Sequence, residues 1–461
     1  MTQHPDRPNV LLIMTDQHRA DCIAAAGNEH IRTPNLDRLA ARGVLMRRCF
    51  TNCPVCAPAR IALASGLNPS RVGAMGNDAY LPRSTPTYYQ RLRDEGYRVG
   101  CVGKLDLAKP DPYNGRFGDR PCTYGWGFTH PCECEGKMHA GQGFRHPKGP
   151  LGPYNFYLRE KGLLQKFCDD YDARAAAGWA YQGRWDSVLD TEDWEDCYIG
   201  RRAAQWIRDI PDDFPWHFFV SFVGPHDPFD PPKEYADRWR SAPVPEAIAP
   251  RREGRPEFIQ KTMRDYDPEI VAVTRRQYYA EIECIDDQVG LILDALEARG
   301  QTDNTYVLFA SDHGEMLGDH GRYTKGVMYE GSMAVPLIAA GPGIQGGRVS
   351  EALVELIDVN ATICDLAGLA PQERIDARSF APLLLGQTDR HRDCAFSEIR
   401  RHRALRTGRY KYISTVNDSP ELYDLQEDPD ELTNLAEARP DVLAEMRKKM
   451  ADRHLQGQWR R

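Results

Sequence analysis

The sequence lacks the features that mark membrane proteins, nucleic-acid-binding proteins and repeat proteins. It contains no apolar run of membrane-spanning length, no Lys/Arg-rich run, no internal repeat and no low-complexity tract. Its 67 acidic residues outnumber its 59 basic residues, and the net charge is -8. We therefore expect neither a membrane nor a nucleic acid as partner. The 461 residues, of which 41% are hydrophobic, predict a globular protein with a substantial core.

The sequence also lacks the marks of an exported protein. The first apolar run, Val10–Met14, is short, and no small-residue cleavage site follows it. The 13 cysteines are odd in number, so we expect reduced thiols and a cytoplasmic location. A zinc site built from Cys122, His130, Cys132 and Cys134 is the alternative interpretation of one cluster. Its spacing is not the usual Cys-x2-Cys, which favours scattered structural cysteines.

Apolar, β-branched-rich runs alternate with amphipathic segments along the first 370 residues. The pairs Thr33-Pro34 and Thr85-Pro86 offer an N-cap and a first-turn proline for two of these segments, which end at Gly43 and Gly96. The predicted strands are 9–14, 97–102, 217–223, 305–310 and 335–340, and the predicted helices are 35–42, 87–95 and 275–299. This alternation predicts an α/β fold with a mostly parallel central sheet flanked by helices.

Polar residues follow the predicted strands at their carboxyl ends. In open α/β sheets that edge is where ligands bind. The residues that four strands deliver there are Asp16, Gln17, Lys104, His226, Asp312 and His313. We expect these side chains to meet in one site.

Two regions depart from the alternating pattern. Residues 108–199 are rich in Gly, Pro and aromatics, which predicts irregular loops that determine substrate specificity. Residues 371–461 contain short β-rich pieces and the amphipathic segment 440–454, which predict a small antiparallel sheet with a terminal helix. We therefore expect a catalytic domain over 1–370 and a C-terminal subdomain over 371–461.

The segment Asn52–Gly66 places a cysteine at the start of a predicted helix. Pro58 suits the first helical turn, Gly66 suits the stop, and Cys56 lies just before the helix. Free backbone N–H groups and the helix dipole favour an oxyanion there, and Arg60 adds a formal charge. The alternative is that Cys56 is a small buried hydrophobe.

The residues at the predicted sheet edge divide into two chemical sets. Asp16, Gln17, Asp312 and His313 supply oxygens and one imidazole, which suit Ca²⁺ or Mg²⁺ and leave room for Mn²⁺. The second set supplies cations and proton donors that match a tetrahedral anion and its leaving oxygen. Its members are Arg60, Lys104, His226 and Lys325.

These residues resemble the type I sulfatases of the alkaline phosphatase superfamily. The resemblance rests on Cys56-Ala57-Pro58-Ala59-Arg60 with Leu63 and Gly66, Asp16-Gln17, Gly103-Lys104, Pro225-His226-Asp227, Ser311-Asp312-His313-Gly314, Thr324-Lys325-Gly326 and Glu421–Leu425. It covers nearly the whole chain and is closest to choline sulfatases and phosphonate monoester/phosphodiester hydrolases. It implies an alkaline-phosphatase-like fold and hydrolysis of a small sulfate or phosphonate ester.

The resemblance also implies a mechanism. A formylglycine-generating enzyme would oxidise Cys56 to formylglycine, which is hydrated to a geminal diol. One hydroxyl attacks the sulfur in line, and the second then expels sulfate from the resulting hemiacetal. Two hydroxyls on one carbon allow this turnover, whereas a serine ester would need water to attack a crowded, anionic sulfur.

Family position assigns roles to individual residues. Asp16, Gln17, Asp312 and His313, with residue 56, would hold one divalent metal. Arg60 would stabilise the diol, Lys104 and Lys325 the sulfate oxygens, and His226 would protonate the leaving alcohol. The family also implies a homo-oligomer by analogy.

Two positions on the substrate side are less firmly placed by the resemblance. Asn77 falls where related enzymes have a polar site residue. Asp106 stands where many sulfatases have a histidine. This raises two hypotheses: that the leaving-group side is arranged differently, or that this chain favours a cationic substrate.

Three functions remain after this comparison. The first is sulfate ester hydrolysis, and the second is phosphonate monoester or phosphodiester hydrolysis on the same residues, because a metal, a diol and cations act on any tetrahedral oxyanion. The third is an inactive metal-binding scaffold that retains the fold.

Overall fold

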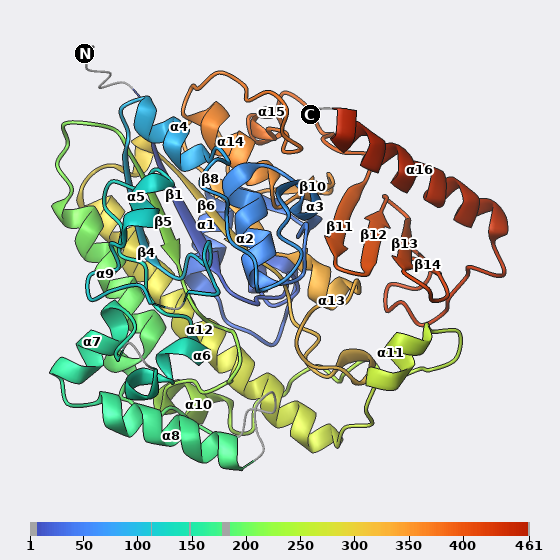
Figure 1. Cartoon of the computed structure of the whole chain (residues 1–461), viewed down its shortest axis with the longest axis horizontal. Helices are drawn as coiled ribbons and strands as arrows, with labels where there is room; N and C mark the ends of the chain where they lie inside the picture. The colour runs from blue at the N-terminus through green and yellow to red at the C-terminus, as the bar shows by residue number, and fades with distance from the viewer. Residues whose placement is uncertain (1–6, 112, 147–148, 178–184, 460–461) are drawn as a thin grey trace.

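The computed structural model describes residues 7–111, 113–146, 149–177 and 185–459. A central sheet lies between layers of helices, and a smaller sheet with one long helix packs beside it (Figure 1). No helix in the described residues is long and apolar enough to cross a membrane.

The central sheet is parallel in the half that carries the predicted strand ends. Its strands, in spatial order, are β4 (Arg98–Gly103), β5 (Trp216–Ser221), β1 (Asn9–Thr15), β6 (Thr305–Ser311), β8 (Leu337–Ala340), β2 (Gly43–Met46) and β9 (Arg348–Ser350). The strands β4, β5, β1 and β6 run parallel, while β8 is antiparallel to both β6 and β2. The carboxyl ends of four successive strands therefore meet at one edge.

Strand β1 is apolar on both faces because both faces are covered. Leu11 and Ile13 belong to one core cluster, and Leu12 and Met14 to another on the opposite face. The first layer contains α1 (Pro34–Ala41), α9 (Glu195–Asp209), α10 (Lys233–Trp239) and α12 (Pro268–Ala298). The second contains α2 (Cys56–Ser65), α4 (Tyr88–Asp94) and α14 (Asp358–Leu366).

Helix starts agree with the sequence patterns, although two of the caps differ. Thr87 caps α4 through a capping box with Gln90, so the cap is Thr87 rather than Thr85. The side chain of Thr33 makes no cap hydrogen bond at α1. The first N–H groups of α1 instead donate to the carboxylate of Asp286, which comes from α12.

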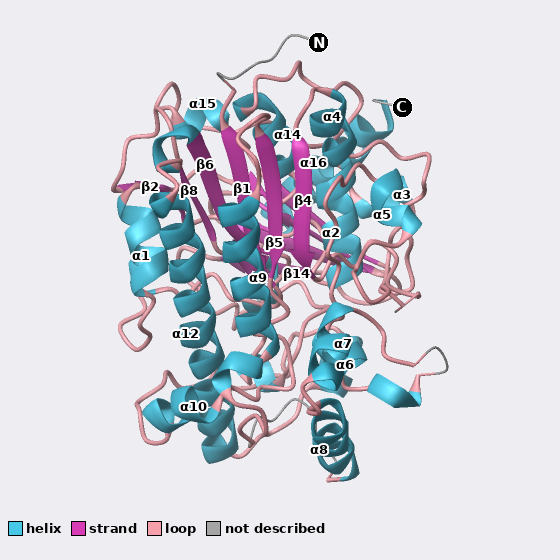
Figure 2. Ribbon diagram, turned by 90° about the vertical axis from the view of Figure 1, so that its left-hand side faces the viewer, coloured by secondary structure: helices cyan, strands magenta, loops and turns pink. Residues whose placement is uncertain are grey.

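Residues 108–199 are more helical than their composition indicated. They contain α5 (Pro121–Gly125), α6 (Lys137–Ala140), α7 (Pro153–Glu160), α8 (Leu164–Ala176) and the start of α9. Figure 2 shows α6, α7 and α8 beyond the carboxyl edge of the sheet. This region therefore covers the edge that carries the polar residues.

The predicted strand 335–340 is divided in the structure. Proline has no N–H for a ladder, and Pro336 separates β7 (Ala334–Val335) from β8. Strand β7 joins a second, three-stranded sheet, in the order β10 (Val354–Glu355), β3 (Cys49–Phe50) and β7. The short helices around it are α3 (Pro69–Val72), α11 (Glu257–Thr262), α13 (Glu330–Met333) and α15 (Ala381–Leu384).

The C-terminal residues form an antiparallel sheet with a terminal helix. Its elements are β11 (Ala395–Ile399), β12 (His402–Arg406), β13 (Tyr410–Thr415), β14 (Glu421–Asp424) and α16 (Pro440–Trp459). The backbone N–H of Glu398 donates to Asn52 O at 2.9 Å. Asn52 in turn donates to Glu355, whose carboxylate also pairs with Arg453 on α16 at 2.9 Å. This sheet and helix thus support the loop that precedes Cys56.

A buried histidine in β5 makes stability depend on pH. The Nδ1–H of His217 donates to Val10 O at 3.0 Å, and its Nε2 has no hydrogen-bond partner among the described residues. Burial lowers the pKa of His217 to about 3, against about 6.5 when unfolded. The stability from this neutral ring is present above pH 6.5 and lost as pH falls towards 3. As the pH falls from 7 to 5, the free energy of unfolding should decrease by about 2 kcal/mol more in the wild type than in His217→Phe.

Urea unfolding midpoints at pH 5, 6 and 7 measure this difference. The exposed His30 provides a control, and His30→Phe should follow the wild-type slope. If the urea midpoints of the wild type and of His217→Phe decrease equally with pH, the expectation is contradicted.

Candidate active site

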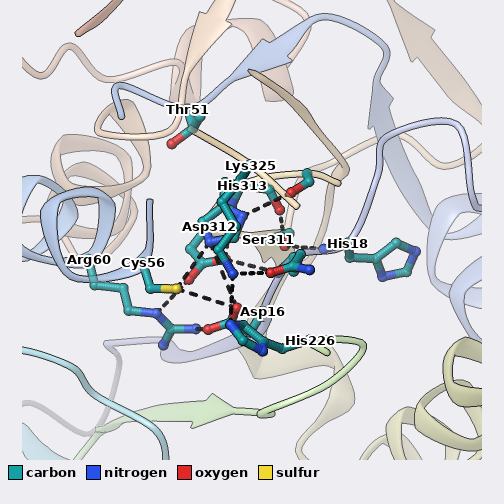
Figure 3. A network of polar contacts seen from close by, with 12 residues as sticks. Asp16, His18, Thr51, Cys56, Arg60, His226, Ser311, Asp312, His313 and Lys325 are labelled. Carbon is teal, nitrogen blue, oxygen red and sulfur yellow. Dashed lines mark hydrogen bonds and ion pairs between the residues drawn. The ribbon is translucent and has the colours of Figure 1, made fainter. Parts of the chain in front are cut away.

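The polar residues predicted at the sheet edge lie together in the structure. Asp16 and Gln17 follow β1, Asp312 and His313 follow β6, and Cys56 begins α2. Figure 3 shows the side chains of Asp16, Cys56, Asp312 and His313 pointing toward one another, while His18 points away. The parallel arrangement of β1 and β6 places Asp16-Gln17 and Asp312-His313 side by side.

Four buried side chains present donor atoms to a common point. One ligand atom from each of Asp16, Cys56, Asp312 and His313 lies within 4.8 Å of the others. The Nδ1–H of His313 donates to Gly314 O at 2.9 Å, so its Nε2 faces the group. That Nε2 lies 3.1 Å from Cys56 Sγ. Burial lowers the pKa of His313, but Asp312 and Cys56 outweigh it and raise that pKa. Among the described residues, no other group of His, Cys, Asp and Glu forms such a set, and this includes the cluster around Cys132 and Cys134.

Arg60 links the two carboxylates of this set. Its Nε donates to Asp312 at 2.7 Å and its Nη2 to Asp16 at 3.1 Å. Its Nη1 donates to Ser221 Oγ at the end of β5 and to Lys104 O. Burial and the charge of Asp16 together raise the pKa of Asp312. Two carboxylates crowded in this way favour a cation between them.

Gln17 is oriented by a network that the sequence did not reveal. It has φ 70°, a left-handed conformation that is rare for residues other than glycine. Its Nε2 donates to Asp227 at 3.1 Å and to Glu315 at 2.5 Å. Burial raises the pKa of Glu315 to about 7. Gln17 Oε1 is thereby left to accept from Lys325.

Two lysines and one histidine face the donor set from the open side. Lys104 Nζ pairs with Asp16 at 2.5 Å, and Lys325 Nζ lies 2.7 Å from His226 Nε2. The Nδ1–H of His226 donates to Asp227 O at 2.6 Å, so its Nε2 is directed toward the site. Burial lowers the pKa of both lysines, but neighbouring anionic groups outweigh it and raise them. Both ammonium groups therefore stay charged.

The environment of Cys56 favours negative charge at its side chain. Burial and Asp16 raise the pKa of the Cys56 thiol, but Lys104, Lys109 and Lys325 outweigh them and hold it well below its usual range. Helix α2 begins at Cys56 itself and ends at Gly66, which adopts φ 71°. The N–H of Ala57 donates to Asn77 Oδ1 at 3.2 Å.

A cavity of about 290 Å³ opens beside these residues. It is lined by Asn77, Lys104, Asp106, Lys109, Gly136, Lys137, Met138, His139, His226, Asp227, Thr324 and Lys325. Residues of the predicted substrate region, 108–199, therefore form one wall. Its size suits a small molecule.

The structure brings together every residue that the sequence singled out. Asp16, Arg60, Asp312 and His313 surround Cys56, and Gln17 contacts Asp312 and Lys325. The remaining five line the cavity, namely Asn77, Lys104, Asp106, His226 and Lys325. Their chemical roles remain predictions.

Several residues that support the site were not singled out. Asp227 and Glu315 orient Gln17, and Ser221 holds Arg60. Asp227 directly follows His226, and Glu315 lies two residues after His313, a proximity that could have revealed them. Lys109 and His139 lie in the irregular region, where the sequence offers no such signal.

Comparison with known proteins identifies the family. The profile described as Sulfatase matches residues 8–369. The chain belongs to the sulfatase family. Membership makes it a hydrolase of the sulfuric-ester class. A second profile, described as N-sulphoglucosamine sulphohydrolase, C-terminal, matches residues 318–456.

Individual relatives extend over nearly the whole chain. An arylsulfatase of Clostridium perfringens is 30% identical over 455 residues, which are 93% of this chain and 90% of the relative. A choline-sulfatase of Rhizobium meliloti is 32% identical over 458 residues, covering 94% and 83%. The structure of a phosphonate monoester hydrolase of Agrobacterium radiobacter matches with a TM-score of 0.81 and 28% identity, covering 98% and 96%. These neighbours confirm the predicted alkaline-phosphatase-like fold.

Proposed function

We propose that this sulfatase-family chain hydrolyses sulfate monoesters with residue 56 as the nucleophile, after conversion of Cys56 to formylglycine, and with one divalent cation. The observation that carries the proposal is the position of Cys56. Its Sγ is one of four buried donor atoms that lie within 4.8 Å of one another, and the positive charges of Lys104, Lys109 and Lys325 hold the pKa of its thiol well below the usual range. Those charges would likewise stabilise an anionic nucleophile at position 56.

The residues around Cys56 fit a hard divalent cation. Asp16 and Asp312 would supply carboxylates and His313 its Nε2. Gln17 would supply the amide oxygen that accepts from Lys325. This donor chemistry suits Ca²⁺, Mg²⁺ or Mn²⁺. When bound, such a cation supplies positive charge that lowers the pKa of the attacking hydroxyl. A thiol is a poor ligand for these ions, which is consistent with an oxygen replacing sulfur at position 56.

The cationic side chains on the cavity side fit the sulfate group. Lys104 and Lys325 would bind the sulfate oxygens and stabilise the charge that develops on them. Arg60 is held by the carboxylates of Asp16 and Asp312 and by Ser221, so it would fix the position of the donor set relative to residue 56.

His226 fits the role of proton donor to the leaving alcohol. Its Nδ1–H is engaged by Asp227 O, which fixes the ring with Nε2 at the cavity. Lys325 Nζ lies 2.7 Å from that Nε2. Once a bound sulfate engages Lys325, the ring would take up a proton at Nε2 and pass it to the leaving alcohol oxygen.

Maturation and metal dependence test this proposal directly. We would produce the protein with a formylglycine-generating enzyme, measure the mass of the tryptic peptide 49–60, and follow sulfate release. We expect the mass of an aldehyde at position 56. Activity should disappear after chelation and return with one of Ca²⁺, Mg²⁺ or Mn²⁺. An aldehyde-bearing, metal-loaded protein that cleaves no sulfate ester would contradict the proposal.

A second candidate function is hydrolysis of phosphonate monoesters or phosphodiesters. The likeness to the phosphonate monoester hydrolase of Agrobacterium radiobacter over 98% of this chain supports it. The same donor set and cations would act on either tetrahedral anion. Parallel kcat/KM values for an aryl sulfate, an aryl phosphonate monoester and a phosphodiester separate the two. If kcat/KM for the phosphonate monoester exceeds that for the aryl sulfate by several orders of magnitude, the substrate is a phosphonate and not a sulfate.

A further inference from the structure

Asp106 carries no free negative charge toward the cavity. Its Oδ2 lies 2.6 Å from Lys109 Nζ and 3.2 Å from Lys104 Nζ. The backbone at Asp106 has φ 55°, a strained conformation for this residue that holds the carboxylate between the two ammonium groups. Lys104 also pairs with Asp16, so the two lysines neutralise the two nearby carboxylates, and Asp106 offers little net charge to a cationic substrate.

Lys109 is a further cation on the cavity wall, in addition to the two lysines that would bind the reacting sulfate. Among the described residues, its Nζ has one hydrogen-bond partner, Asp106 Oδ2. An ammonium group has three N–H donors, so two remain for a ligand. The side chain lines the cavity and is 18% exposed, and Asp106 limits where the ammonium can lie.

Helix α6 places an apolar surface and a neutral imidazole beside Lys109. Lys137 anchors this helix, because its buried Nζ pairs with Glu281 at 2.6 Å and with Asp230 at 3.0 Å. The next two residues, Met138 and His139, face the cavity. Met138 is 40% exposed and so offers apolar surface to the cavity. Burial lowers the pKa of His139 to about 4, so its ring is neutral at pH 7.

We propose that Lys109, Met138 and His139 form the subsite for the alcohol part of the ester, and that they select alcohols bearing a second anionic group, a carboxylate or a second sulfate, beside an apolar face. The inference rests on the proposed function, in which Lys104 and Lys325 bind the reacting sulfate. Lys109 then pairs with the second anion, Met138 contacts the apolar face, and His139 donates or accepts a hydrogen bond. Asp106 positions Lys109.

Equilibrium binding tests the subsite without requiring turnover. We would titrate the metal-loaded Cys56→Ala protein with phenyl sulfate, with 3- and 4-sulfooxybenzoate, and with choline sulfate as a cationic ester. We expect the better sulfooxybenzoate isomer to bind about ten-fold more tightly than phenyl sulfate, and choline sulfate more weakly than either. In Cys56→Ala/Lys109→Met the preference for the carboxylate should disappear, whereas Lys109→Arg should retain it.

Lys448→Met in the same background is the matched control. Lys448 is an exposed lysine on α16 that pairs with Asp452, and its loss should leave the affinity ratio unchanged. Three results would overturn the proposal: a carboxylate preference that survives Lys109→Met, an equal loss of affinity for all esters, or tighter binding of choline sulfate. An equal loss would make Lys109 a ligand of the reacting sulfate.

Turnover of the matured protein separates this inference from the proposed function. The Lys109→Met variant should lower kcat/KM for the carboxylated ester about ten-fold more than for phenyl sulfate. Failure of the matured wild type to cleave any sulfate ester would contradict the proposed function alone. The affinity ratios of the Cys56→Ala protein would still decide whether the subsite exists.

Discussion

The Cys56→Ala protein is expected to lose kcat for its best sulfate ester by about 10⁴-fold or more, because removal of a nucleophile commonly costs up to about 10⁶-fold. The fold should survive, since Cys56 contributes one small buried side chain at the start of α2. Sulfate release under saturating substrate measures the loss, and thermal unfolding serves as the control for folding. A variant that keeps more than a tenth of the wild-type rate would exclude residue 56 as the nucleophile.

The Cys56→Ser variant distinguishes a diol from a single hydroxyl. Produced without any maturation enzyme, serine offers one hydroxyl, and its sulfate ester has no second hydroxyl that could expel sulfate. We expect at most one turnover and a mass increase of one SO₃ group on peptide 49–60. Continued turnover by an unmodified serine would show that water resolves the intermediate.

Arg60→Met is expected to reduce the free energy of unfolding of the metal-free protein by about 3–5 kcal/mol, the range for breaking a buried ion pair by removing one partner. The guanidinium is 1% exposed and pairs with Asp312 at 2.7 Å and Asp16 at 3.1 Å. Asp16 keeps Lys104 as a partner, so most of the lost stability should come from the Asp312 carboxylate, which loses its ion-pair partner. Urea unfolding at pH 7 in the presence of a chelator measures it.

Two comparisons sharpen the Arg60 experiment. Arg98→Met removes a solvent-exposed pair with Asp213 and should cost less than about 1 kcal/mol. Addition of the activating divalent cation should reduce the cost of Arg60→Met, because the cation neutralises the same carboxylates. A cost near that of Arg98→Met in the metal-free protein would mean that the carboxylates around Arg60 are protonated or hydrated.

Much of the fold could be predicted from local patterns. The apolar runs at 9–14, 97–102, 217–223 and 305–310 correspond to β1, β4, β5 and β6, because strands covered on both faces are apolar throughout. The C-terminal pieces correspond to β11–β14 and α16 for similar local reasons.

Features that depend on distant partners could not be predicted. The division at Pro336 and the antiparallel direction of β8 depend on which strands lie beside them. The cap of α1 comes from Asp286, about 250 residues away along the chain. Residues 108–199 have weak periodicity because α5, α6 and α7 are short, and tertiary contacts such as those of Lys137 help to hold them.

The sequence by itself determined the family, the sheet edge and the identity of the residues gathered there, because strand periodicity and the residues after each strand are local properties. Only the tertiary structure decided how those residues are paired. Gln17 is oriented by Asp227 and Glu315, and Asp106 is neutralised by Lys104 and Lys109. The charge that a side chain presents to a ligand depends on its neighbours in space, and at short range those neighbours are set by the packing of distant segments.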